Sequence, residues 1–565
     1  MLTRVTESDV AAPRFAAGTR RLALALALLG GALAAIVTLG PRILDIRDLG
    51  WLLHGTLGPD PVAYLVAWQY LATSPWSWPP GLNPDYGIEL SSAIFYVDAV
   101  PLLAFLAKAL RPVLEVPQYW GPWMVLCSAL QAGFGWKLLG EAVEDPVARG
   151  LGAVLLAFQP MLLNRMGGHF PLVAQWAVLW ALWLAIRPVP RRQGALWVAC
   201  LGLAALMNAY ITAMCGLVWA ADWVNRAWQG RIWRGPGAPA ALVQAVAVPG
   251  VTLGSLWLAG FFSLGGEVMP VGLHYGYSQF DLTAPFDALE WGRLLPELPG
   301  LRHWEVGGSY LGAGSLALMA LAGVLALRAP AGLGAVLGRR LPLLAMLLAM
   351  LGFAISNRLA IAGQVFPLFE VPHALLRLAD MLRASERFFW PLGYALIFAA
   401  AALVARRLPL QPARAVLAGA LLLQLGDIEA GMGRFRDLVA QAPRVAADRL
   451  PDPFWPQAAL RYSRVRAVPA GNFALHWEEI ARFAAPRHIP TDAVYLSRID
   501  PALIEALNAR TLADLAAGRW EPGTLYVLRD AATEALVRPR LDPARDLLGQ
   551  RDGLTVFAPG WFAPR

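Results

Sequence analysis

The chain has 565 residues, of which 57% are hydrophobic and 15% are charged, and its mean hydropathy is +0.50. Soluble domains carry about 25% charged residues, so the composition excludes an ordinary soluble protein and favours a membrane protein. The net charge is +8, but the arginines stand in short clusters between apolar runs. A nucleic-acid-binding protein gathers basic residues on one face. We therefore expect no nucleic-acid partner and interpret these clusters as signals of membrane topology.

The apolar runs predict an α-helical polytopic membrane protein with about 11 transmembrane helices, because roughly 20 apolar residues cross a bilayer as a helix. The predicted spans are residues 22–40, 119–138, 147–163, 170–186, 194–209, 210–225, 240–264, 307–327, 340–356, 388–405 and 412–427. The first is interpreted as an uncleaved anchor with a cytoplasmic N-terminus. The run 194–225 is divided at Asn208, because a single span would move the later arginine clusters outside.

The first outer loop is predicted to cover residues 41–118, with seven acidic and four basic residues. Within it, residues 92–110 include Asp98, Pro101 and Lys108, so an interfacial or re-entrant helix is expected there rather than a span. Five of the seven histidines also fall in predicted outer loops. These patterns place the functional groups on the outer side of the membrane.

Beyond residue 427 the apolar runs shorten. Alternating patterns predict strands within residues 462–468, 492–499, 524–530 and 554–559, and helices over 477–485 and 501–517. We therefore expect a transmembrane domain of residues 1–427 and a C-terminal α/β soluble domain of residues 428–565. The parity of the spans places this second domain outside the cytoplasm.

The segment PDPVAYLVAWQYL (59–71) sets an Asp-Pro pair soon after the first predicted helix. It resembles the DPYxxYR-like motif of oligosaccharyltransferase catalytic subunits and the DE-type motif of protein mannosyltransferases, which are GT-C glycosyltransferases. Val62 and Ala63 depart from the oligosaccharyltransferase pattern, and no WWD-like motif follows, so transfer to an asparagine sequon is not expected. Three longer stretches resemble a bacterial GT-C-like family: WSWPPGLNPDYGIELSSAIFYVDAVPLLAF (76–105), FQPMLLNRMGGHFPLVAQWAVLW (158–180) and RASERFFWPLGY (383–394).

The resemblance implies an inner-membrane glycosyltransferase of bacteria. It would move a sugar from a polyprenyl-phosphate-linked donor to a periplasmic or envelope acceptor, which is a glycan, a lipid or a protein. Such an enzyme needs a base for the acceptor hydroxyl, a role worth about 10²–10⁴-fold in rate. We predict Asp60 as this base, although an Asp before Pro also suits the start of a helix. Asp48 is the reserve base.

Asp98 is predicted to assist Asp60, because an ionisable group in an apolar membrane stretch is costly. It would support the base, bind the sugar, or ligate Mg²⁺ or Mn²⁺ together with Asp60; the alternative is an ion pair with an arginine. The donor phosphate is assigned to Arg165, Arg383 and Arg387, because a planar guanidinium matches phosphate oxygens. An ion pair of Arg383 or Arg387 with Glu386, Asp380 or the first loop is the alternative. The predicted sugar or acceptor contacts are His169, Tyr64, Tyr275 and Glu305.

Neither a Walker A sequence nor a dinucleotide fingerprint is found, so no nucleotide cofactor is expected. Two other functions stay open. One is a transporter or flippase of lipid-linked sugars, which would set ionisable residues in two repeated halves. The other is a non-catalytic scaffold of an envelope-polysaccharide complex. Convergence of Asp60 and Asp98 in one cavity would favour the enzyme.

Overall fold

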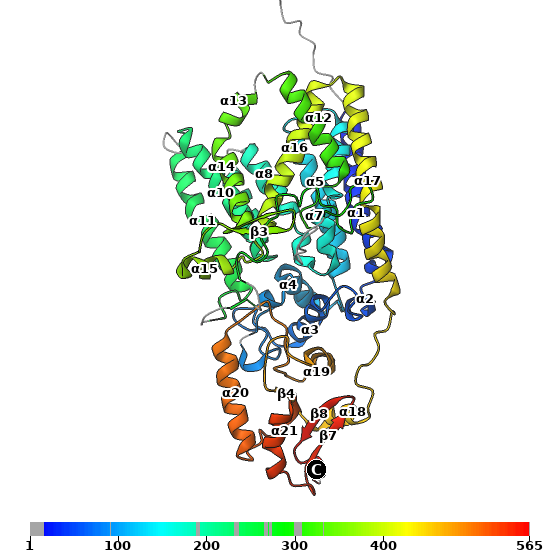
Figure 1. Ribbon diagram of the computed structural model, residues 1–565, viewed down its shortest axis with the longest axis vertical. Coiled ribbons are helices and arrows are strands. Elements are labelled where there is room, and N and C mark those ends of the chain that lie inside the picture. The colour runs from blue at the N-terminus through cyan, green and yellow to red at the C-terminus, as the bar shows by residue number, and fades with distance from the viewer. Residues whose placement is uncertain are drawn as a thin grey trace, which may run out of the picture.

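The computed structural model describes residues 16–90, 92–187, 192–230, 237–264, 269–270, 274–298, 308–330 and 333–563. Apolar helices fill one end of an elongated molecule, and the C-terminal domain forms the other end (Figure 1). Between them lie three helices of the predicted first outer loop, α2 (Gly50–Leu53), α3 (Asp60–Thr73) and α4 (Pro101–Leu110). The protein is therefore a helical membrane protein with a separate C-terminal sheet domain.

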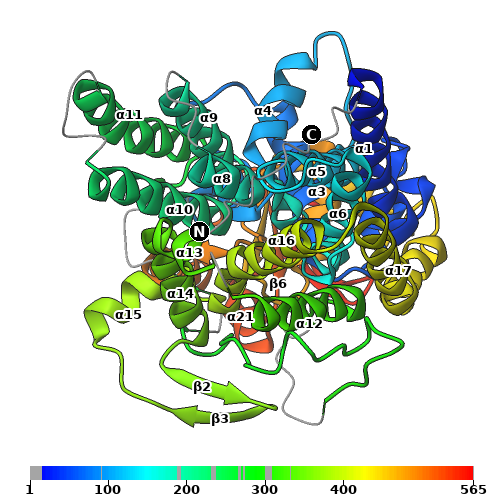
Figure 2. The same cartoon turned by 90° about the horizontal axis from the view of Figure 1, so that it is seen from above.

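Every predicted span contains a helix. These helices are α1 (Ala17–Leu39), α5 (Trp120–Leu139), α6 (Pro146–Ala157), α8 (Trp176–Ile186), α9 (Gln193–Ala205), α10 (Ala209–Trp228), α11 (Gly237–Leu258), α12 (Ala313–Arg328), α14 (Leu341–Ile355), α16 (Trp390–Arg407) and α17 (Leu410–Gln441). Shorter helices are α7 (Pro160–Leu163), α13 (Leu333–Gly338) and α15 (His373–Asp380). Seen from above, α9, α10 and α11 lie on one side of the bundle and α1, α6 and α17 on the other (Figure 2).

Four segments within the described residues are long and apolar enough to cross a membrane: Ala17–Leu39, Ala238–Leu258, Ser385–Arg407 and Leu410–Gln441. A fifth is gained if the bent pair Pro146–Ala157 and Pro160–Gly167, with 43° between its helices, is one span. The predicted number of eleven spans is therefore not confirmed. Several apolar runs fold as helices of only 10–17 residues, so an apolar run overestimates the length of the helix inside it.

The helix break predicted at Asn208 is present. α9 ends at Ala205, and the side-chain oxygen of Asn208 accepts the Tyr210 amide at 2.9 Å at the start of α10. Asparagine is a favoured residue at this position because it satisfies a helix amide that has no partner within the helix.

α17 continues past the predicted domain boundary at residue 427 and ends at Gln441. The fully buried Asp427 carboxylate accepts hydrogen bonds from the Tyr310 hydroxyl at 2.5 Å and from the Leu294 and Ala313 amides at 3.0 and 2.9 Å. A buried carboxylate is tolerated when its oxygens are satisfied in this way. Asp427, which lies at the predicted boundary, is therefore an internal anchor of the helix.

The C-terminal domain contains a four-stranded sheet in the order β4-β6-β8-β7, in which β4 and β6 are parallel and the other pairs antiparallel. Its elements are α18 (Phe454–Arg461), β4 (Arg464–Val468), α19 (Trp477–Ala484), β5 (Arg498–Ile499), α20 (Pro501–Ala516), β6 (Thr524–Leu528), α21 (Ala531–Val537), β7 (Leu547–Arg551) and β8 (Leu554–Ala558). The α/β character predicted for this region is confirmed. A separate hairpin, β2 (Arg358–Ile361) and β3 (Gln364–Pro367), lies in the membrane part.

The predicted strand over residues 492–499 is wrong except for β5, which pairs with β1 (Met269–Pro270). The rest of this segment runs along the membrane part. The Thr491 amide donates to the Asp85 carbonyl at 3.0 Å, and the Tyr495 amide donates to the Tyr86 hydroxyl at 3.0 Å. The alternating apolar residues of this segment are therefore buried at the interface between the two parts. Burial at such an interface gives the same alternating sequence pattern as burial in a sheet.

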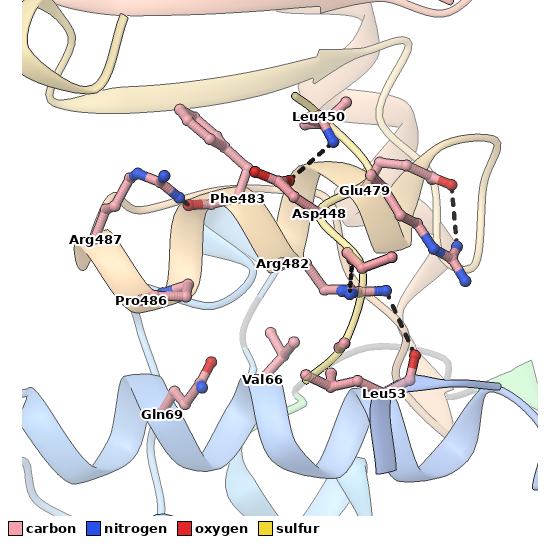
Figure 3. Close-up of a pocket in the computed structure, with 13 residues that line it drawn as sticks. Leu53, Val66, Gln69, Asp448, Leu450, Glu479, Arg482, Phe483, Pro486 and Arg487 are labelled. Carbon is pink, nitrogen blue, oxygen red and sulfur yellow. Dashed lines mark hydrogen bonds and ion pairs between the residues drawn. The ribbon is translucent and has the colours of Figure 1, made fainter. Parts of the chain in front are cut away.

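A buried arginine joins the two parts of the protein. The Arg466 side chain on β4 is 1% exposed and pairs with Glu89 of the first loop at 2.6 Å, Glu521 at 2.7 Å and Asp492 at 3.2 Å. Nearby, α19 packs over α3, where Arg482 donates to the Leu53 carbonyl at 3.4 Å beside a cavity of about 250 Å³ (Figure 3). These contacts fix the C-terminal domain on the first loop.

We expect Arg466→Ala to lower the free energy of unfolding by about 3 kcal/mol, because removing one member of a buried ion network leaves the others unpaired. The loss lies at the low end of the usual range, since Glu89 and Glu521 are 33% and 31% exposed. Denaturant unfolding in detergent measures it. Arg519→Ala, which removes an exposed pair with Asp514, is the matched control and should change stability little.

The same network predicts a loss of stability in acid. Burial alone raises the pKa of Glu89, but hydrogen bonding and charge from Arg466 outweigh it and lower that pKa to about 2. The contribution of ionised Glu89 to the stability of the fold is complete above the unfolded pKa of about 4.3, and it is lost as the pH falls toward 2. The free energy of unfolding of the wild type should therefore fall in acid, and that of Arg466→Ala should fall less. A wild type without this loss, or an equal loss in Arg466→Ala, would contradict the role of the network.

Candidate functional site

A cavity of about 680 Å³ lies where the first loop, the helical part and the C-terminal domain meet. The polar and charged side chains in its lining include Asp60, Tyr64, Asp98, His169, Asn208, Tyr210, Arg383, Arg387, Tyr495, Ser497 and Arg498. Six of the ten residues predicted for the site are brought together here, including both proposed catalytic carboxylates. They come from segments up to 327 residues apart, from Asp60 to Arg387.

Asp60 is the first residue of α3, and Pro59 occupies the N-cap position without a side-chain cap. The carboxylate therefore lies in the first helical turn, where the helix dipole favours negative charge. His169 Nε2 is 3.6 Å from Asp60 Oδ2. The Tyr495 hydroxyl lies beside the Asp60 carboxylate, and burial, together with the Asp60 charge, raises the pKa of Tyr495. Tyr495 thus stays protonated, and its hydroxyl proton is available to the carboxylate.

Asp98 lies between the 3-10 turn Ile94–Val97 and α4, with φ at +52°. The Asn208 amide donates to Asp98 Oδ1 at 3.2 Å, so the residue at the helix break also orients this carboxylate. Burial raises the pKa of Asp98, while Arg387 and Arg498 oppose the shift. A non-glycine residue in the left-handed region costs on the order of 1–3 kcal/mol and is found most often at functional sites.

Three arginines face the same cavity. The Arg387 guanidinium lies 4.5 Å from the centre of the Tyr210 ring, and the Tyr210 hydroxyl accepts the Ala384 amide at 3.1 Å. Arg498 donates to the Met381 carbonyl at 3.2 Å and so holds the loop that carries Arg383. Burial and the charge of Arg498 lower the pKa of Arg383. Like charges gathered in this way favour an anionic ligand that neutralises them.

The pair Asp60 and Asp98 does not fit the predicted Mg²⁺ or Mn²⁺ site well. Arg387 and Arg498 lie close enough to Asp98 to influence its ionisation, and such charges repel a divalent cation. No group of three or more His, Cys, Asp or Glu that could hold a metal occurs in the part of the chain that the structure describes. The three arginines suit a bound anion, and the two carboxylates lie in the same cavity.

Other predicted residues lie elsewhere. Asp48 is buried in an ion pair with Arg42 and does not line the cavity, so it is poorly placed as a reserve base. Arg165 is 2% exposed, its guanidinium lies 5.8 Å from the centre of the Trp390 ring, and it does not line the cavity. Glu305 lies outside the described residues.

Tyr275 packs against Phe353 and donates its hydroxyl to the Phe353 carbonyl at 3.1 Å, outside the cavity lining. Sequence analysis missed Asn208, Tyr495 and Arg498 as site residues. Asn208 was visible as the break in a long apolar run. The other two lie in a segment with strand-like alternation, and nothing local indicates that it reaches the membrane part.

The model of a family described as "Domain of unknown function (DUF6311)" matches residues 27–429, and the model described as "DUF6311 C-terminal domain" matches residues 454–559. The comparison with curated proteins gives no match. Among solved structures, the chain is similar to the archaeal oligosaccharyltransferase AglB from Archaeoglobus fulgidus, in complex with an inhibitory peptide and a dolichol-phosphate. The identity is 13% and the TM-score 0.41, over 97% of this chain and 75% of that chain.

Proposed function

The chain belongs to the DUF6311 family, and we propose that it is a membrane glycosyltransferase that moves a sugar from a polyprenyl-phosphate donor to an acceptor hydroxyl. The observation that carries this proposal is the cavity in which Asp60 and Asp98 lie beside Arg383, Arg387 and Arg498. A carboxylate base and a group of phosphate-binding cations are the two parts that this reaction needs.

In the proposed reaction, the acceptor oxygen attacks the anomeric carbon of the donor sugar. The bond between that carbon and the phosphate oxygen breaks, and polyprenyl phosphate leaves with the bonding electrons. Asp60 takes the proton of the acceptor hydroxyl as the new bond forms, and the anomeric configuration inverts. Tyr495 and His169 keep the Asp60 carboxylate in place through the contacts described above.

The phosphate gains negative charge as it departs, so fixed cations around it stabilise the transition state more than the bound donor. Arg383 and Arg387 would face this group, and Arg498 would hold their loop in position. Asp98, which Asn208 orients, would accept hydrogen bonds from the hydroxyls of the donor sugar. Arg165 does not line the cavity, so no direct contact with the phosphate is proposed for it.

The polyprenyl chain would leave the cavity on the side of the membrane part. Phe95, Phe261 and Phe262 line the cavity, and we assign the chain to this group of rings. Phe262 also lines a neighbouring cavity of about 410 Å³ beside Trp257, whose ring lies 5.1 Å from that of the exposed Trp78. Continuous aromatic surface of this kind suits an apolar chain in contact with lipid.

Transport and scaffolding are the competing functions. A scaffold has no use for two oriented carboxylates and several arginines in one cavity, and a flippase has no use for a base held by a tyrosine and a histidine. We propose the inner membrane of bacteria as the location, with the cavity on the periplasmic side, and an envelope glycan, lipid or protein as the acceptor. A divalent cofactor is not part of the proposal.

Farnesyl phosphate, a short polyprenyl phosphate, tests the donor site. We expect it to raise the unfolding temperature of the purified protein in detergent, since a ligand that binds only the folded state stabilises it. Farnesol, which lacks the phosphate, should stabilise much less. Equal stabilisation by both compounds would contradict the assignment of the arginines to phosphate.

A further inference from the structure

Phe473 of the C-terminal domain lines the cavity and is 45% exposed. Its φ is +52°, in the left-handed region that L side chains rarely adopt. Holding a phenylalanine there costs on the order of 1–3 kcal/mol, and the exposed ring forgoes the gain from burial. A ligand that covers the ring would restore the gain from burial that the exposed ring lacks.

The loop that presents Phe473 is held firmly. The Asn472 side chain donates to the Leu496 carbonyl at 2.8 Å and accepts the Leu496 amide at 2.8 Å. The Phe473 amide donates to the Val494 carbonyl at 2.9 Å. Three hydrogen bonds therefore fix this loop to the segment that carries Tyr495, and Phe473 keeps its place without a ligand.

The rings form a continuous wall. Phe473 and Tyr495 have ring centres 4.5 Å apart at 36°, and Trp477 packs behind them with its ring centre 5.5 Å from that of Tyr495. Trp477 is only 6% exposed, so it supports the wall without forming its surface. The Tyr495 hydroxyl at the end of this wall lies beside Asp60.

We infer that Phe473 and Tyr495 form the acceptor subsite and that the acceptor is a carbohydrate. This inference rests on the proposed function, in which the reacting hydroxyl lies at Asp60. An acceptor that places its reacting hydroxyl at Asp60, next to Tyr495, covers the Phe473 ring with the portion adjoining that hydroxyl. The ring of Phe473 offers an apolar face without hydrogen-bonding groups, and the C–H face of a pyranose ring packs on such a surface.

The surroundings favour a carbohydrate over a lipid or a peptide. The wall belongs to the C-terminal domain, whereas Phe261 and Phe262, which we assign to the donor chain, follow α11 of the membrane part. Next to it, Ser497 and Arg498 offer a hydroxyl and a guanidinium to the hydroxyl groups of a sugar. A sugar ring has one apolar face and a polar rim, so a flat aromatic face flanked by polar groups matches it.

Phe473→Gly tests the inference, because glycine adopts a positive φ without cost. Relief of strain should offset the lost ring contacts, so the unfolding temperature should hold. Octyl glycosides with different sugars serve as acceptor probes, beside a polyprenyl-phosphate sugar as donor. We expect the acceptor KM to rise about tenfold or more, while the donor KM and stabilisation by farnesyl phosphate stay unchanged. Phe473→Trp, which keeps an aromatic face, should retain a low acceptor KM.

Phe562→Ala is the matched control, since Phe562 is 57% exposed on the same domain and does not line the cavity. Its acceptor KM should equal that of the wild type. An unchanged acceptor KM in Phe473→Gly would overturn the subsite, and so would labelling of peptides but of no glycoside. Failure of the wild type to transfer sugar from any lipid donor to any acceptor would instead refute the proposed function, so the two failures are distinguishable.

Discussion

Asp60→Asn is expected to lower sugar transfer by about 10²–10⁴-fold, the contribution of a positioned general base. Asparagine matches the size of aspartate and keeps an oxygen for Tyr495, so the fold and the cavity should persist, but it cannot take the proton of the acceptor. The rate of transfer from a radiolabelled donor by the purified variant measures the effect. Stabilisation by farnesyl phosphate should be retained, because the phosphate contacts are untouched.

Tyr495→Phe gives a graded comparison. It leaves the Asp60 carboxylate in place but removes the neighbouring hydroxyl donor that favours its charged form. The acidic limb of the rate against pH should therefore move to higher pH, with a smaller loss of maximal rate than in Asp60→Asn. His169, Tyr64 and Asp98 also line this cavity and stay unchanged in both variants. Transfer that survives Asp60→Asn within about threefold of the wild type would move the base to Asp98.

Arg387→Ala is expected to lower kcat/KM for the donor by about 10²-fold, the usual loss when one fixed donor to a developing anion is removed. Arg387 is 7% exposed, so water replaces its guanidinium poorly. Steady-state kinetics with varied donor measures the loss. The stabilisation by farnesyl phosphate should fall in parallel.

Arg387→Lys separates charge from shape. Lysine keeps the positive charge but lacks the planar fork that matches two phosphate oxygens, so an intermediate loss is expected. Arg358→Ala, on the exposed face of β2, is the control and should leave donor kinetics unchanged. A donor kcat/KM in Arg387→Ala equal to that of the wild type would remove this residue from the phosphate site.

Much of the cavity lining was predictable, because several of its residues are charged although the sequence around them is apolar. Asp98 stands in an apolar stretch, Asp60 precedes a proline at a helix start, and Arg383 and Arg387 lie together near a predicted span. A charge in or beside an apolar stretch is costly without a function, so the sequence alone marks Asp98, Arg383 and Arg387, whereas Asp60 also suits the start of a helix. Arg165 shows the limit of this reasoning, since a charge beside a span is also accommodated over the ring of a buried tryptophan.

Long-range packing explains what the sequence could not predict. Helix positions follow from local hydrophobic runs, and a helix is found in every predicted span. The number of helices long enough to cross a membrane cannot be predicted from these runs, because it depends on where each helix ends. Tyr495 and Arg498 reach the cavity because Thr491 and Tyr495 bond to the first loop, more than 400 residues away in sequence. No local pattern encodes such a contact.

The central claim is that a bond to the sugar is broken and remade in this cavity. Its most direct test uses wild-type protein in vesicles supplied with a radiolabelled polyprenyl-phosphate sugar and an octyl glycoside. We expect the label to become covalently attached to the glycoside and free polyprenyl phosphate to accumulate in equal amount. Label that crosses the bilayer while still joined to its lipid, with no disaccharide formed, would contradict the enzyme and support a flippase.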